Sequence, residues 1–274
     1  MKMIFFENNW RLMVDDFIYQ LQHTFHPVQY SINDSELRDM LLTDLEYILS
    51  RNGAHINMFN LPRKTHSNTY YYGNRLIEEE MSYDIDKLEE EANKLYLFLN
   101  TDQKHAFHTI AQNVLDNKPG LYFVHGYGGT GKTYLWNTIV YYLRAHKKIV
   151  LTVASSEVAS LLLPNGRTAH SRFKIPIDID DTTTCEIKRD TILAELLRTS
   201  LIIWDETIMT NKQCFEALDR SLRDIHVQIN PDAQDLPFGG KVIVLGGDLQ
   251  QILPIIENGS RSQIIDATIV KSYL

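Results

Sequence analysis

Eight residues near the middle of the chain have the types and the spacing of a phosphate-binding loop. Residues 126–133 read GYGGTGKT, which fits the pattern G-x-x-x-x-G-K-[ST] in full. The glycines allow a tight turn whose backbone N–H groups point inward, and such a nest at a helix N-terminus favours a polyphosphate. Lys132 is expected to reach the β- and γ-phosphates, and the Thr133 hydroxyl to ligate Mg²⁺. The predicted nucleotide-binding residues of this stretch are Gly126, Gly128, Gly129, Thr130, Gly131, Lys132 and Thr133.

Two acidic side chains end an apolar segment further along the chain. Residues 200–206 read SLIIWDE, a predicted apolar strand that ends in Asp205 and Glu206. In nucleotide-binding sheets the carboxyl ends of the strands lie beside the phosphate loop. Asp205 is expected to hold Mg²⁺, and Glu206 to orient or deprotonate the attacking water. The pair favours hydrolysis over simple transfer of a phosphate.

A third strand end carries a carboxylate and an amide. Residues 245–254 read LGGDLQQILP. Because parallel strands end on the same edge of a sheet, Asp248 and Gln251 are expected to approach the γ-phosphate and its water. An uncharged amide at that point can sense whether the γ-phosphate is present. The predicted catalytic set is therefore Lys132, Asp205, Glu206 and Gln251.

The nucleotide and the reaction class are narrowed by what the chain lacks. A GTPase would need the guanine-binding pattern Asn-Lys-x-Asp. In residues 210–214 (TNKQC) Cys214 stands where the Asp is needed, and this stretch follows Asp205 too closely in the sequence. A small-molecule kinase does not need the Asp205–Glu206 pair. ATP hydrolysis coupled to motion, with ATP and Mg²⁺ as cofactors, is the class that these residues favour.

Apolar and helical segments alternate from about residue 95 onward. Strands are predicted at 121–125, 147–154, 196–206 and 240–248, and helices at 130–146 and 212–226. In the second helix Phe215, Leu218, Leu222 and Ile225 share one face. Buried strands that alternate with helices predict an α/β fold with a parallel sheet and helices on both sides.

The front of the chain has a different pattern, and residues 1–94 are predicted to form a mostly helical N-terminal region. Residues 61–83 show no clear period and contain Pro, Gly and Asn, so they are predicted to be a linker. Residues 84–100 are predicted to form a charged helix that leads into the main domain, which covers 95–274. The clearest early helix is expected over 33–53, with caps and an apolar stripe at Asn33, Glu36, Leu37, Met40, Leu41, Leu45, Ile48, Leu49 and Gly53.

Composition excludes few partners. The net charge of the 274 residues is −8, but the first hundred residues, with nine basic and 16 acidic side chains, carry most of it. The remainder is close to neutral, which permits a basic groove for nucleic acid without showing one.

No apolar run is long enough to span a membrane. Cys185 and Cys214 give neither a disulfide framework nor zinc spacing, so both are expected to be reduced intracellular thiols.

Five stretches in order give the chain a family resemblance. They are residues 99–107 (LNTDQKHAF), the phosphate loop, the IIWDE strand end, residues 150–176 and residues 237–256. Together they resemble a Pif-family DNA helicase (superfamily 1, 5′-to-3′), of the group found in eukaryotic genomes and Helitron-type transposons. The resemblance covers roughly 95–274 and implies a RecA-like P-loop NTPase domain. It further implies that Gln103 reads the adenine base and that Gln251 senses the γ-phosphate.

Residues 150–176 resemble the segment that contacts single-stranded DNA in this family. Hydroxyls and cations can grip phosphates, and an aromatic ring can stack on a base, although an ordinary polar loop has a similar composition. The family implies single-stranded and forked DNA as partners, and roles in telomere maintenance, repair and recombination. A nuclear location is expected only because the substrate is DNA. The expected DNA contacts are Ser155, Ser156, Thr168, His170, Arg172 and Phe173.

The sequence departs from the family pattern at three points. Glu157 stands where the family usually has Gly, and Gln250 where it usually has Arg. Family members continue into a second RecA-like domain that supplies arginines to the nucleotide, whereas this chain stops at Leu274. We therefore expect ATP binding, weak hydrolysis and no processive unwinding. The alternatives are a non-catalytic nucleotide- or DNA-binding remnant of a transposon helicase, and a protein-remodelling ATPase.

Overall fold

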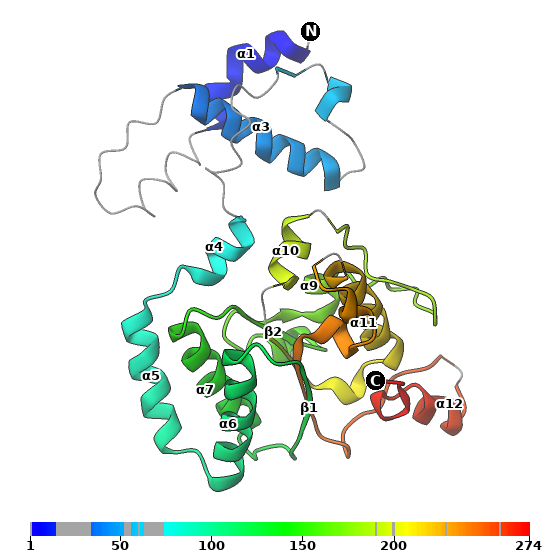
Figure 1. The fold of residues 1–274 in the computed structure, drawn as a ribbon. Coiled ribbons are helices and arrows are strands. Elements are labelled where there is room, and N and C mark those ends of the chain that lie inside the picture. Colours follow the sequence, from blue (N-terminus) through cyan, green and yellow to red (C-terminus); the bar gives the residue numbers. More distant parts are fainter. Residues whose placement is uncertain are drawn as a thin grey trace. The chain divides into compact units, whose positions relative to one another are not determined.

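The computed structural model describes residues 2–14, 34–51, 56–59, 61–62, 74–189, 191–198, 201–227, 229–257 and 259–274. The chain divides into two compact units, Met1–Tyr72 and Gly73–Leu274. Figure 1 shows their elements in colours that follow the sequence. The described residues of the first unit are mostly helical, and the second unit contains the sheet that the sequence predicts.

The first unit is built from α1 (Lys2–Met13), α3 (Asp34–Arg51) and the 3₁₀ helix η1 (Ile56–Phe59). Its helical character and the helix expected near residues 33–53 are confirmed. Apolar side chains of the two longer helices form a small core of Phe6, Trp10, Val14, Leu37, Leu41 and Leu42. Several residues of the predicted caps and stripe lie outside the described residues or have side chains that do, namely Asn33, Glu36, Met40, Ile48 and Gly53.

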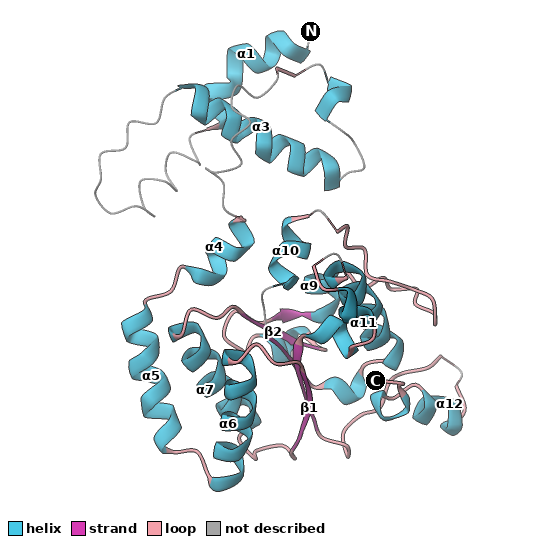
Figure 2. Cartoon of the chain, viewed as in Figure 1, coloured by secondary structure: helices cyan, strands magenta, loops and turns pink. Residues whose placement is uncertain are grey.

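A five-stranded parallel sheet forms the centre of the second unit (Figure 2). The strands lie in the order β1-β5-β4-β2-β3. Val, Ile and Leu make up most of the three middle strands, and their side chains suit a sheet that is buried on both faces. The predicted α/β class is confirmed. The strand bounds are β1 (Gly120–His125), β2 (Val150–Ala154), β3 (Arg167–Thr168), β4 (Leu201–Asp205) and β5 (Val242–Gly247).

One face of the sheet is covered by α5 (Ile85–Leu97), α6 (Thr101–Leu115) and α7 (Lys132–Ala145). Successive side chains of a strand point to opposite faces, so alternate residues of the middle strands reach this layer. Ile203 of β4 packs here in the same core as Trp136 of α7, and both are fully buried. The helix that carries the phosphate loop is therefore fixed against the sheet by its apolar side.

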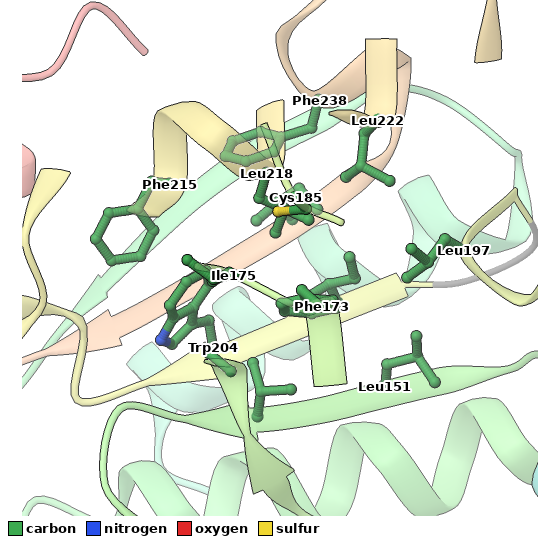
Figure 3. Close-up of a cluster of buried hydrophobic side chains, with 14 of the residues drawn as sticks. Leu151, Phe173, Ile175, Cys185, Leu197, Trp204, Phe215, Leu218, Leu222 and Phe238 are labelled. Carbon is green, nitrogen blue, oxygen red and sulfur yellow. The ribbon is translucent and has the colours of Figure 1, made fainter. Parts of the chain in front are cut away.

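The opposite face is covered by α9 (Ala169–Phe173), α10 (Ile192–Arg198) and α11 (Lys212–His226). Figure 3 shows this second core, in which Trp204 of β4 lies among side chains from all three helices and from the neighbouring strands. The apolar face predicted for residues 212–226 is confirmed, because its members are all buried: Phe215, Leu218, Leu222 and Ile225.

Short helices occupy most of the remaining connections. Two of them begin where strands end: α8 follows Ser156, and η2 follows Glu206. None of the helices in the described part of the chain is long and apolar enough to cross a membrane. The bounds are α8 (Glu157–Ser160), η2 (Thr207–Met209), η3 (Pro231–Gln234), η4 (Pro237–Gly240), α12 (Arg261–Asp266) and η5 (Ile269–Lys271).

The first strand differs from its prediction as a buried strand. β1 lies at one edge of the sheet, and its side chains alternate between half-buried and exposed. Tyr122 and Val124 pack against the core under α6, while Leu121 and Phe123 are 36% and 40% exposed. An apolar run cannot reveal this difference, because periodicity does not distinguish an edge strand from a central one when both of its faces carry apolar residues.

The predicted linker over 61–83 is wrong for its second half. Residues 75–81 form α4 (Arg75–Met81), which Asn74 caps by accepting hydrogen bonds from the backbone N–H groups of Leu76 and Ile77. Leu76 and Ile77 also pack against the core under α10 and α11. The compact sheet unit therefore begins before residue 95, at about the place where α4 starts.

Both cysteines are free and buried, in agreement with the expected absence of a disulfide framework. Burial raises the pKa of the Cys185 thiol to about 12 and that of the Cys214 thiol to about 11. Such thiols are protonated at neutral pH and unreactive as nucleophiles. Both side chains fill space in the core that α11 covers, and Cys214 belongs to α11 itself.

Candidate nucleotide site and nucleic-acid interface

The predicted phosphate loop joins β1 to α7 and lies at the carboxyl edge of the sheet. Its first glycine is tied to the neighbouring strand, because the Gly126 N–H donates to Gly247 O at 3.2 Å. Gly129 and Gly131 have φ values of 79° and 82°, in the left-handed region that glycine tolerates best. Gly131 caps α7 without a side chain, so the backbone N–H groups of the first helical turn face the loop and can receive an anion.

Lys132 lies inside this loop. Its Nζ donates to the carbonyl oxygen of Gly126 and, at 3.2 Å, to that of Tyr127. The loop is further closed by Thr130, whose hydroxyl donates to Tyr127 O at 2.8 Å. The ammonium group is thus held at the centre of the turn, where its charge adds to that of the backbone nest.

Gln103 contacts the same loop from α6. Its Oε1 accepts from the Asn100 N–H at 3.0 Å in a capping box, and its Nε2 donates to Thr130 O at 3.1 Å and Gly131 O at 3.4 Å. This amide therefore braces the loop against the start of α6. The structure brings Gln103 to the predicted phosphate loop, and its reading of an adenine base stays a prediction.

Asp205 ends β4, which is separated by β5 from β1 and the phosphate loop. Its side chain is only 7% exposed, and Oδ1 is buried with no hydrogen-bond partner. In the adjacent strand β5, a Cβ atom at Gly246 would lie 2.6 Å from Asp205 Oδ1. Glycine at this position therefore leaves space for the carboxylate. A buried, unpaired carboxylate oxygen is costly unless a cation or donor completes it.

Glu206 follows in a conformation that is rare for a residue with a side chain. Its φ of 54° and ψ of 42° lie in the left-handed region, where such strain persists mainly at functional sites. The Ser155 hydroxyl donates to Glu206 O at 2.7 Å, and the Ser156 hydroxyl donates to Glu206 Oε2 at 3.2 Å. Two serines that follow β2 therefore hold the backbone and the carboxylate of this residue.

The donors at this edge fit a magnesium ion. Mg²⁺ is usually held by one or two carboxylates together with hydroxyls, waters and phosphate oxygens. Asp205 offers the unpaired Oδ1, and Thr133 lies one residue beyond Lys132 at the start of α7. The described residues contain no cluster of three or more His, Cys, Asp or Glu side chains that could hold a metal on its own. An ion at Asp205 would take its further ligands from hydroxyls, waters or phosphate oxygens.

Asp248 and Gln251 lie on the turn after β5, as predicted. Asp248 is 6% exposed, and its Oδ1 accepts from the Gln250 N–H at 3.0 Å while its carbonyl oxygen accepts from the Gln251 N–H at 2.9 Å. Asp248 thus shapes the turn that presents the amide. Gln251 is exposed and lines a cleft together with Glu206, Met209, Gln250 and Ile252.

Two of the six predicted DNA contacts are contradicted by their burial. Phe173 is fully buried with its ring centroid 5.9 Å from that of Trp204, and Figure 3 shows it in the core. Arg172 is also buried, and its Nη2 donates to Glu80 Oε1 at 2.5 Å. Neither side chain can reach a nucleic acid from these positions. The sequence suggested otherwise because residue types alone do not show which side of a short helix faces the core.

The other four predicted contacts differ in whether their side chains can contact a nucleic acid. Ser155 accepts hydrogen bonds from Trp204 Nε1 and Thr210 Oγ1 in addition to its donation to Glu206, so its hydroxyl is fully used inside the protein. Ser156 and Thr168 are half-buried and His170 is exposed, so these three stay candidates. Although His170 is exposed as a residue, the protein shields its ring partly from water, and this desolvation lowers the pKa of the imidazole.

Comparison with known proteins assigns the chain to a family. A protein-family model described as PIF1-like helicase matches residues 98–274, which is more than half of the chain. The chain belongs to the PIF1-like helicase family. The match begins at the end of α5 and includes the phosphate loop, the Asp205–Glu206 pair and the turn with Gln251. The elements α1, α3 and α4 precede it.

Individual relatives agree with this membership. The chain is 33% identical over 144 residues to ATP-dependent DNA helicase Pif1 of Psychrobacter sp. (strain PRwf-1), which covers 52% of this chain and 20% of that relative. It is also 33% identical over 150 residues to ATP-dependent DNA helicase PIF4 of Trypanosoma brucei brucei, with coverage of 53% and 18%. The chain thus spans about a fifth of the length of these curated relatives.

A solved structure shows the same fold. Pif1 helicase from Bacteroides in complex with ADP-AlF3 and single-stranded DNA superposes with a TM-score of 0.50 at 25% sequence identity. The similarity covers 64% of this chain and 39% of that one. The parallel sheet with its flanking helices is therefore the RecA-like part of a PIF1-like helicase.

Proposed function

We propose that this chain provides the ATP-hydrolysing motor of a 5′-to-3′ DNA helicase. The observation that carries the proposal is the meeting of three strand ends at one sheet edge. Gly126 follows β1 and contacts Gly247, Asp205 ends β4 and Glu206 follows it, and Gln251 lies on the turn after β5. Family membership and the ADP-AlF3 and single-stranded DNA in the Bacteroides Pif1 structure support the same two ligand classes here.

The residues at this edge suit an in-line hydrolysis. The loop N–H groups and Lys132 bind and neutralise the β- and γ-phosphates. Gln251 orients the γ-phosphate and a water, and Glu206 accepts the proton as the water oxygen bonds to phosphorus. The bond from phosphorus to the bridging oxygen breaks, and ADP leaves with that electron pair. Magnesium held by Thr133 and Asp205 would supply further charge neutralisation on the phosphates.

Single-stranded DNA is the proposed second ligand. Ser156 follows β2, which adjoins β4, whereas Thr168 ends the edge strand β3 and His170 lies in α9 directly after it. Hydroxyl and imidazole groups can donate to backbone phosphates without reading sequence. Glu157 is exposed beside them, and its carboxylate should weaken this contact.

A fluorescence titration with single-stranded DNA distinguishes this proposal from its alternatives. A helicase motor and a DNA-binding remnant should both bind with an affinity that falls as salt rises. A protein-remodelling ATPase should show no such binding. Loss of hydrolysis with retained ATP and DNA binding would identify the remnant.

Unwinding of forked DNA, and any role in telomere maintenance, repair or recombination in a nucleus, are proposals for the whole helicase. Translocation requires parts that open and close around the nucleotide. The residues described in the second unit form one such part, with an acidic pair and a γ-phosphate sensor on its edge. We expect residues 1–274 to bind ATP and to hydrolyse it.

A further inference from the structure

We propose that Ser156 is a positioning residue for Glu206, and that a backbone phosphate of single-stranded DNA competes with Glu206 for the Ser156 hydroxyl. The inference rests on the proposed function, since it takes Glu206 as the base and DNA as a ligand. It adds a direct link between the two sites, formed by one hydrogen bond between neighbouring strand ends.

The contact lies where β2 and β4 end side by side. Ala154 pairs with Asp205 in the sheet, so the residues that follow each strand are brought together. Ser156 Oγ donates to Glu206 Oε2 at 3.2 Å. The same Oγ accepts from the Ala159 N–H at 3.2 Å and thereby caps α8. Because a hydroxyl has one hydrogen, Ser156 can donate to only one acceptor at a time.

The backbone of Glu206 is fixed independently of this bond. Ser155 donates to Glu206 O at 2.7 Å and accepts from Trp204 and Thr210 at 3.2 and 2.6 Å. Trp204 is itself fully buried, so this serine is anchored in the core. The left-handed backbone of Glu206 is therefore set by Ser155, and the direction of its carboxylate is left to Ser156. The two adjacent serines have separate tasks.

The competition follows from the position of Ser156. Its side chain is half-buried at the start of α8, whereas Val158 and Leu161 beside it are 76% and 78% exposed, so this short helix borders solvent. A phosphate oxygen arriving there is as good an acceptor as a carboxylate. When the hydroxyl turns to the phosphate, Glu206 Oε2 is released and can accept a hydrogen bond from the attacking water instead.

A double-mutant cycle on DNA affinity tests this competition without requiring turnover. The affinity of the full chain for a fluorescein-labelled oligo-dT is measured by anisotropy at one salt concentration. The four proteins are wild type, Glu206→Ala, Ser156→Ala and the double variant. Glu206→Ala frees the hydroxyl and also removes a negative charge. The charge effect persists when Ser156 is replaced, so the cycle isolates the hydroxyl.

We expect Glu206→Ala to strengthen DNA binding about three- to tenfold more in the wild-type background than in the Ser156→Ala background. Ser156→Thr keeps the hydroxyl and the cap, and should restore the coupling that Ser156→Ala removes. Thermal unfolding of each protein shows whether it is folded. An equal effect of Glu206→Ala in both backgrounds would overturn the competition while leaving the proposed function in place. Absence of DNA binding by all the folded proteins would overturn both.

Discussion

Arg172 and Glu80 are 92 positions apart in the sequence, yet the guanidinium donates to the carboxylate at 2.5 Å in the interior of the protein. Their side chains are only 5% and 7% exposed. Arg144 shares the same carboxylate at 3.2 Å and lies over the ring of Tyr83 at 4.5 Å. Through Glu80, α4 therefore joins the helix that carries the phosphate loop to the helix that follows Thr168.

Replacing Glu80 should destabilise the protein strongly. Burial lowers the pKa of Arg144 and of Arg172, and the Glu80 carboxylate opposes that effect by stabilising both charges. Glu80→Leu leaves two buried guanidinium groups without their anion, which should cost about 3–5 kcal/mol of unfolding free energy. Urea denaturation measures the change. The matched control is Glu78→Leu on the exposed side of α4, which should stay within about 0.5 kcal/mol of wild type. Similar losses in the two variants would contradict the buried pairing.

Phe173 should behave as a core residue and not as a DNA contact. Phe173→Ala opens a cavity beside Trp204 and should lower the unfolding free energy by about 3–5 kcal/mol. Phe98→Ala, at a ring that is 80% exposed, provides the control and should change stability little. A folded Phe173→Leu protein should bind single-stranded DNA like wild type. A selective loss of DNA affinity in that variant would show that the ring faces the nucleic acid after all.

Lys132 should be required for nucleotide binding. Removing its ammonium group takes a charge-assisted contact from the phosphates, so Lys132→Ala should weaken binding of a fluorescent ATP analogue about tenfold or more. Lys87→Ala on the exposed surface of α5 tests whether loss of any positive charge has this effect, and it should not. Unchanged ATP affinity in Lys132→Ala would show that the phosphate loop does not bind the nucleotide.

Lys241 should make stability depend on pH in the alkaline range. Burial lowers its pKa from the ordinary 10.5 to about 8. Between these values the unfolded chain binds more protons than the folded one, so the free energy of unfolding rises with pH. Relative to a Lys241→Met variant, wild type should gain about 1–2 kcal/mol between about pH 8 and pH 10. The test uses the difference in unfolding free energy between the two proteins, because other groups that both proteins share titrate in the same pH range. A constant difference across this range would contradict the burial of the ammonium group.

Much of the sheet unit could be predicted because its signals are local. The phosphate loop follows a fixed spacing, and runs such as VLTVA and LIIWD predict strands whose ends then define a common edge. Asp205, Glu206 and Gln251 were placed at that edge by the parallel arrangement alone. Their mutual geometry follows from the register in which Trp204 of β4 pairs with Leu245 of β5.

What could not be predicted depends on contacts distant in sequence. α4 has only seven residues and a polar EEE run, so no periodic signal marks it, and its anchor is the pairing of Glu80 with Arg172. The same pairing turns the Arg172 side chain inward. Its polar neighbours His170 and Lys174 are exposed and give no sign of this in the sequence. The separate tasks of Ser155 and Ser156 likewise appear only when β4 lies beside β2.

The most direct test of the central claim is steady-state ATP hydrolysis by the whole chain, with and without single-stranded DNA, beside a Glu206→Gln control. Glu206→Gln keeps the size of the side chain and its acceptor oxygen but removes the base. The account predicts measurable hydrolysis that DNA increases and that Glu206→Gln abolishes. Hydrolysis at the same rate in the Glu206→Gln protein, or none at all in wild type that binds ATP and DNA, would contradict a working hydrolytic site at this sheet edge.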